Sequence, residues 1–111
     1  MEMRKQEMNA VFKSIVKWES NYAMSYGCPL SRNVIMRQNK LNLYQYRKQV
    51  KELKEKGLIK YERYIERTYC EGFLEDVYFV QGWRLTSEGR NTELFKQALA
   101  EAEKRVENYL W

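Results

Sequence analysis

Residues 50–59, Val-Lys-Glu-Leu-Lys-Glu-Lys-Gly-Leu-Ile, decide the fold. They predict a helix that stops at Gly57 and passes directly into a strand, because glycine adopts the left-handed C-terminal cap without steric cost. Residues 83–90, Trp-Arg-Leu-Thr-Ser-Glu-Gly-Arg, predict the converse: a strand that passes into a helix capped by Thr86. The alternating, aromatic-rich segment between them predicts a β-hairpin. The expected order is therefore helix, hairpin, helix.

The helix before Gly57 is expected to span residues 42–56, with Asn42 as its N-cap. Its apolar residues recur at spacings of three and four, so one stripe faces the core. This stripe contains Leu43, Tyr46, Val50 and Leu53. Lysines in its last turn also complement the helix dipole.

Three further helices are predicted from the same kind of pattern. Residues 5–24 have the periodicity of one amphipathic helix. A short helix from Arg32 to about Gln38, capped by Ser31, is expected to turn Val34 and Ile35 inward. The helix that Thr86 caps is expected to run to the end of the chain.

The hairpin is expected to pair residues 59–69 with 77–85 across a turn at 70–76. Gly72 can take positive φ in that turn. Val77, Phe79, Trp83 and Leu85 are expected on one face. Gly82 interrupts the second strand, which predicts a bulge or a close approach of another backbone segment.

The composition is that of one folded domain. The 111 residues are 44% hydrophobic, and we expect a single domain over 1–111, with a core at about 5–86 and a C-terminal helix at about 87–110. No apolar run reaches the roughly 18–20 residues of a membrane span. The charged N-terminus has no apolar stretch behind it, so no signal peptide is expected, and we predict a cytoplasmic protein.

Catalytic and metal-binding chemistry find little support in the residues. The chain has no histidine, the commonest general base and metal ligand. Cys28 and Cys70 are too few for a tetrahedral zinc site. They can form a disulfide or remain as reduced thiols, and we favour the thiols. We expect no enzymatic activity, no metal and no cofactor.

Positive charge is concentrated in one part of the chain. Residues 32–60 contain nine basic and two acidic side chains, a net charge of +7, so the remainder sums to −2. A basic patch on one structural unit indicates a polyanionic partner. The alternative is a solvated helix surface.

The two stretches resemble motifs of winged helix-turn-helix transcription regulators of the MarR and PadR families. In those families the recognition helix ends in Leu-x-x-x-Gly-Leu-Ile and the wing in Leu-Thr-x-x-Gly-Arg, matched here by residues 53–59 and 85–90. The pair Leu43-Tyr44 is similar to a Leu-Tyr near the start of the PadR recognition helix. The resemblance covers roughly residues 27–90, and the 70–76 segment lacks the Asp-x-Arg element typical of MarR wings.

The resemblance implies an α+β, mainly helical fold: a three-helix core, a two-stranded β-hairpin wing and a long C-terminal helix. Small phage and mobile-element proteins often carry diverged winged helices, and we expect such an origin. The implied function is sequence-specific binding of double-stranded DNA, as a transcriptional repressor, with helix 42–56 in the major groove.

The DNA-binding residues are expected on that helix and beside it. Tyr44, Gln45 and Lys48 would meet base edges, with Gln45 pairing to adenine. The other expected contacts, to guanine or to the DNA backbone, are Arg47, Lys51, Arg32, Arg37 and Lys40, with Lys60 and Arg63 at the base of the wing. The alternatives are that Tyr44 packs within the chain, that Gln45 is solvated, and that the lysines form i,i+4 pairs with Glu52 and Glu55.

The C-terminal helix is the expected dimer element, because such helices build two-fold dimers in the families named above. The residues concerned are Leu94, Leu99, Val106, Leu110 and Trp111. Packing within the chain is the alternative to a homodimer. A different function also stays open: a protein-binding module, such as a phage inhibitor or antirepressor, that uses the apolar Phe73 and Leu74 amid the acidic residues of the 70–76 segment.

Overall fold

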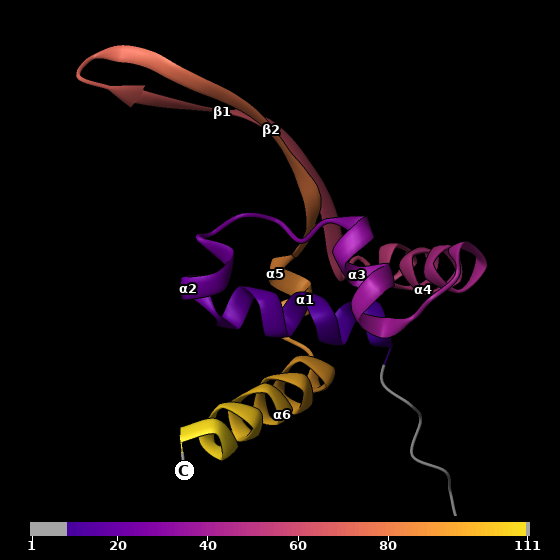
Figure 1. The fold of residues 1–111 in the computed structure, drawn as a ribbon. Helices are drawn as coiled ribbons and strands as arrows, with labels where there is room; N and C mark the ends of the chain where they lie inside the picture. Colours follow the sequence, from indigo (N-terminus) through magenta and orange to yellow (C-terminus); the bar gives the residue numbers. More distant parts are fainter. Residues whose placement is uncertain (1–8, 111) are drawn as a thin grey trace, which may run out of the picture.

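The computed structural model describes the backbone of residues 9–110 and the side chains of residues 9–104 apart from Met24. It is an α+β fold in which a two-stranded antiparallel hairpin rises from a helical body (Figure 1). The elements are α1 (Ala10–Ser20), α2 (Tyr22–Ser25), α3 (Arg32–Asn39), α4 (Leu43–Glu55), β1 (Ile59–Cys70), β2 (Phe73–Leu85), α5 (Ser87–Arg90) and α6 (Glu93–Leu110).

The junction of α4 and β1 has the geometry that the sequence predicts. Gly57 has φ +70°, its N–H donates to the Lys54 carbonyl at 3.0 Å, and the Leu58 N–H donates to the Leu53 carbonyl at 3.0 Å. These two bonds form a Schellman C-cap. The Thr86 N–H donates to the Leu58 carbonyl at 3.0 Å, so the two stretches that decide the fold meet in space.

The hairpin is longer than predicted. The ladder runs from Ile59 opposite Leu85 to Cys70 opposite Phe73, with a register shift beside Thr68 that leaves residue 75 unpaired as a β-bulge. The predicted turn over 70–76 is wrong: the turn consists of residues 71 and 72, which have φ of 53° and 84°, as in a type I′ hairpin turn. Twelve residues of strand span about 40 Å, and the hairpin curves away from the helices as an arm (Figure 1).

A short backbone bridge ties the base of the arm to the loop before α3. The Leu30 N–H donates to the Trp83 carbonyl at 3.1 Å, and the Trp83 N–H donates to the Leu30 carbonyl at 2.8 Å. Gly82 lies against this bridge, where a Cβ atom would collide with the Leu30 carbonyl. The predicted close backbone approach at Gly82 is therefore confirmed.

The core surrounds α1, which contacts α2, α3, α4, β2 and α6. In Figure 1, α1 lies between the arm on one side and α6 on the other. The fully buried side chains come from α1, the Leu30 loop, α3 and the end of β2; they are Val11, Phe12, Ile15, Val16, Leu30, Ile35 and Leu85. Ile35 thus lies inward as predicted, and Val34 packs at the edge of the core.

Several predicted helix limits are corrected. The single helix over 5–24 is divided at Asn21, which has non-helical φ and ψ, and residues 5–8 lie outside the described part of the chain. Ser20 and Asn21 are weak helix formers whose side chains compete for backbone groups. The helix that Thr86 caps ends at Arg90, because the Thr92 hydroxyl caps a new helix by accepting from the Phe95 N–H at 3.1 Å.

The predicted core stripe of α4 is also shorter than expected. Tyr46, Val50 and Leu53 are buried, whereas Leu43 is 41% exposed. Leu43 is the first residue of α4, and the preceding Leu41 packs against the core in its place.

Candidate nucleic-acid interface

The start of α4 is fixed by a reciprocal cap. The Asn42 side chain accepts from the Gln45 N–H at 2.8 Å, and the Gln45 Oε1 atom accepts from the Asn42 N–H at 3.0 Å. This is a capping box, in which both side chains satisfy helix N–H groups. Bidentate pairing of Gln45 with adenine would need the same Oε1 atom. In the structure, the side chain of Gln45 therefore caps the start of α4.

The outer surface of α4 presents the predicted cations. Tyr44 is 74% exposed, and Arg47, Lys48 and Lys51 are exposed with it. Side chains three or four residues apart share one side of a helix, which groups Tyr44 with Lys48 and Lys51. Lys54 lies one turn beyond Lys51, with its Nζ atom 5.9 Å from the centre of the Trp83 ring. The cationic side of α4 therefore borders the base of the arm.

Most of these cations lack a compensating charge. Lys51 lies 3.9 Å from Glu55, a weak, exposed pair. Within the described part of the chain, five of the cations predicted on α3, α4 and the turn between them form no ion pair: Arg32, Arg37, Lys40, Arg47 and Lys48. We call these five residues together with Lys51 the basic surface.

The contribution of α3 to the basic surface comes from its two ends. The Ser31 hydroxyl caps the helix by accepting from the Val34 N–H at 3.4 Å, which places Arg32 in the first turn. Arg37 lies in the last turn, and Lys40 follows in a left-handed conformation with φ 51°. All three cations are exposed.

A groove of about 380 Å³ joins α3, α4 and the arm. It is lined by Ser31, Arg32, Asn33, Tyr46, Tyr61 and Gln81. The Tyr61 hydroxyl donates to Gln81 Oε1 at 3.0 Å, and its ring packs edge-on against Trp83 with centroids 5.0 Å apart. The arm thus turns its Tyr61 face toward the two helices.

Under the groove, a buried hydrogen bond holds α4 to the arm. The Trp83 indole Nε1–H donates to the Tyr46 hydroxyl at 2.7 Å. Burial raises the pKa of Tyr46 above its ordinary value, and this effect exceeds the opposing influence of the hydrogen bond from Trp83. The pair positions the base of the arm relative to the basic surface.

The two predicted wing residues lie on opposite faces of the arm. Side chains opposite each other across the ladder share a face, so Arg63 lies with Gln81 on the Tyr61 face. Lys60 lies on the other face, with its Nζ atom 3.8 Å from Glu62. The structure thus brings Arg63, but not Lys60, toward the groove.

Two residues that sequence reasoning did not select share the face of Arg63. They are Arg67 and Phe79, and Phe79 is 82% exposed. The alternation of residues 59–69 was a signal that could have found Arg67, because even spacings place Tyr61, Arg63 and Arg67 on one face of the strand. Arg67 was not selected because the hairpin was expected to be shorter than it is.

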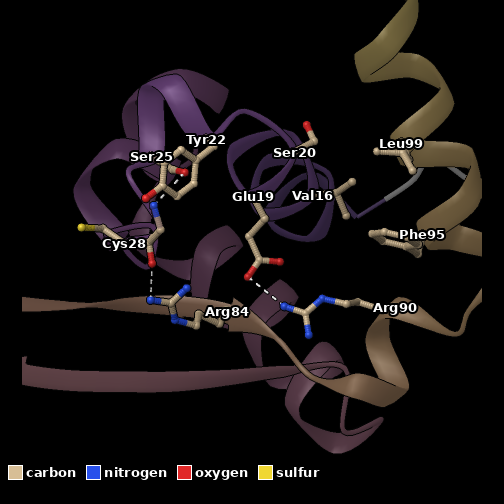
Figure 2. A pocket seen from close by; sticks show the side chains of 11 residues that line it. Val16, Glu19, Ser20, Tyr22, Ser25, Cys28, Arg84, Arg90, Phe95 and Leu99 are labelled. Carbon is tan, nitrogen blue, oxygen red and sulfur yellow. Dashed lines mark hydrogen bonds and ion pairs between the residues drawn. The ribbon is translucent and has the colours of Figure 1, made fainter.

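A second pocket, of about 270 Å³, lies on the other side of the arm between α1, α2, β2, α5 and α6 (Figure 2). Glu19 Oε1 lies 3.4 Å from Arg90 Nη2 and accepts from the Leu85 N–H at 3.4 Å. Burial raises the pKa of Glu19, and this effect exceeds the opposing influence of Arg90. Figure 2 shows Arg84 reaching the loop at Cys28, where it donates to the Gly27 carbonyl. The contacts of Glu19 hold α1 to the end of β2 and to α5, and the contact of Arg84 holds β2 to the loop after α2.

The C-terminal helix packs on its own chain as far as its side chains are described. Ala98 is buried, Phe95 and Leu99 pack against the core, and Lys13 pairs with Glu101 at 2.7 Å. Among the predicted dimer residues, Leu94 is 37% exposed. The side chains of Val106 and Leu110, and the whole of Trp111, lie outside the described residues.

The described residues contain no cluster of three or more His, Cys, Asp or Glu side chains that could hold a metal ion. None of the helices in the described part of the chain is long and apolar enough to cross a membrane. Cys28 and Cys70 are free thiols. Comparison with known proteins found no matching family model, no matching curated protein and no matching solved structure.

Proposed function

We propose that the chain is a winged-helix protein that binds double-stranded DNA with α4 in the major groove and acts as a transcriptional repressor. The order α1, bridge at Leu30, α3, α4, β1, β2 is that of a winged helix, with the arm as the wing. An exposed helix fits the major groove of B-DNA, which is about 12 Å wide.

The observation that carries the proposal is the basic surface. Its side chains project from α3, the residue after it and α4, and lack compensating acids apart from the weak pair at Lys51. One of them, Arg32, lines the groove at the base of the arm. Charged residues left unpaired on one side of a small domain favour a polyanion. Within it, Arg47, Lys48 and Lys51 would reach bases or phosphates, while Arg32, Arg37 and Lys40 would hold the DNA backbone.

Fluorescence anisotropy with labelled duplex DNA across a salt series tests the proposal. Five to seven phosphate contacts would make log K fall with log salt at a slope of about −5 to −6. Replacing both Lys48 and Lys51 by Glu should weaken binding at least tenfold, because it reverses two charges on α4, the helix proposed to enter the major groove of the DNA. The matched control reverses Lys96 and Lys104, two exposed lysines of α6, and should bind as the unmodified chain does.

Binding that is weak and indifferent to salt would refute the proposal, and equal losses in both double variants would refute the placement of α4. A second candidate function then gains weight. Phe73 and Leu74, 78% and 54% exposed at the tip of the arm, favour docking to another protein. Under that function, which needs no DNA binding, replacing both by Ser should abolish the complex with the protein partner.

A further inference from the structure

The two faces of the arm differ in charge. The register places Arg63 and Arg67 on the face of Tyr61, and none of the paired positions on this face is acidic. The opposite face carries the acids Glu62, Glu66 and Asp76. We call the first surface the arginine face. Its exposed members are Tyr61, Arg63, Ile65, Arg67, Tyr69, Leu74, Val77, Phe79 and Gln81.

The arginine face alternates cations with rings and apolar side chains. Along β1 the order is Tyr61, Arg63, Ile65, Arg67 and Tyr69. Neither arginine forms an ion pair with any residue that the structure describes. Both cations are therefore available to a ligand.

The rings beyond the base of the arm are open. Phe79 is 82% exposed and Tyr69 is 62% exposed, and Ile65, which pairs with Phe79, is 44% exposed. Rings exposed to that extent are accessible to a ligand. Two-stranded hairpins with uncovered apolar side chains are marginally stable alone, so a ligand on this face would also stabilise the arm.

Charge decides between the possible occupants. A second copy of the arginine face would bring arginines against arginines, with no acid between them, which is unfavourable. A ligand that combines negative charge with flat aromatic surfaces complements both the arginines and the rings. Single-stranded nucleic acid is such a ligand, because every base has a π-face once it is unstacked, and its backbone carries the charge.

We propose that the arginine face binds single-stranded nucleic acid, with Phe79 and Tyr69 stacking on bases and Arg63 and Arg67 holding phosphates. At its base this face lines the groove beside Arg32 and Tyr46, so it continues from the basic surface. The next step rests on the proposed function. If α4 holds a duplex and the arm holds a single strand, the preferred substrate is a duplex with a single-stranded extension.

The experiment compares three labelled probes in anisotropy titrations: a blunt duplex, the same duplex with an oligothymidine extension of about 10 nucleotides, and free oligothymidine of about 15 nucleotides, within the range that such sites cover. The unmodified chain should bind the free strand and should prefer the extended duplex to the blunt one at least fivefold. Phe79→Ala should remove that preference, because stacking on one base contributes about this much.

The matched control is Phe73→Ala. Phe73 is a phenylalanine of the same arm, 78% exposed, but it pairs with Cys70 on the opposite face. It should leave the preference intact. Since both rings are exposed, neither variant should perturb folding, which circular dichroism verifies. Replacing both Arg63 and Arg67 by Ser should weaken binding of the free strand and flatten its salt dependence.

The outcomes separate this proposal from the proposed function. If the variant with Lys48 and Lys51 reversed loses the blunt duplex but retains the free strand, both stand. If no probe with a single strand is preferred, the arm proposal fails while duplex binding can stand. Equal effects of Phe79→Ala and Phe73→Ala would overturn it. The proposal would also fail if Phe79→Ala weakened binding of the blunt duplex as much as binding of the extended duplex. The arm would then lie on intact double-stranded DNA.

Discussion

At the scale of single residues, the bond between Trp83 and Tyr46 joins α4 to the arm. Replacing Tyr46 by Phe removes the acceptor of the buried indole N–H at 2.7 Å. An unsatisfied buried donor costs about 1–3 kcal/mol, so we expect the free energy of unfolding to fall by that amount in urea titrations.

The control for that prediction is Tyr44→Phe, which removes a hydroxyl from a side chain that is 74% exposed. It should change the free energy of unfolding by less than about 0.5 kcal/mol. Losses of the same size in both variants would show that the hydrogen bond adds nothing to stability.

Glu19 predicts a pH dependence of stability. Burial raises its pKa in the folded chain above the ordinary value of 4.5, so the folded state holds this proton more tightly than the unfolded state. Its contribution to stability is greatest below 4.5 and is lost as the pH rises through the raised pKa. Glu19→Gln cannot titrate, and the stability of the unmodified chain relative to this variant should therefore decline as the pH rises above 4.5.

Urea titrations of both chains at several pH values measure that difference. Glu103→Gln, at an exposed position of α6, serves as the control and should track the unmodified chain. A difference that stays constant or grows with pH would contradict the raised pKa.

At the scale of elements, the capping box of α4 is open to test. Asn42→Ala removes the side chain that accepts from the Gln45 N–H at 2.8 Å. Loss of such a cap costs about 0.5–2 kcal/mol. Gln38→Ala, at an exposed position of α3, is the control and should be neutral. A neutral Asn42→Ala would show that the helix start is held by packing alone.

The elements also show what the residues could predict. The junctions at Gly57 and Thr86, the caps Ser31 and Asn42 and the approach at Gly82 were predictable, because each depends on local chemistry. Glycine is required at 57 by positive φ and at 82 by the neighbouring backbone. These residues fix where elements begin, end and meet.

The length of the arm was not predictable in the same way. Glu71 takes φ 53°, which is unusual for a residue other than Gly, Asn or Asp, so the two-residue turn carried a weak signal. The apolar residues 73 and 74 looked like a loop tip although they pair in the ladder. The basic residues of α3 and α4 could be selected from the clustering of charge in the sequence. The arginine face could not, because its members are brought together by the pairing register of the two strands.

At the scale of the whole molecule, the proposed nucleic-acid interface and the C-terminal helix α6 lie on different sides of α1. The basic surface and the groove lie where α3, α4 and the arm meet, while α6 lies on the other side of α1 (Figure 1). Phe95, Ala98 and Leu99 of α6 pack on the chain's own core. Leu94, which is 37% exposed, is therefore the predicted dimer residue, among those whose side chains are described, that is most accessible to a partner.

We therefore predict a homodimer through α6, with a mass in light scattering of twice the 13.6 kDa of one chain. Leu94→Glu should shift it to the monomer, because a carboxylate placed in an apolar contact must be desolvated. Lys96→Glu, two residues away and exposed, should leave the dimer intact. A two-fold dimer would bind half-sites about 34 Å apart, so Leu94→Glu should weaken binding to a palindromic duplex more than to a single half-site. A monomeric mass for the unmodified chain at every concentration would refute the dimer and leave α6 as a brace for α1.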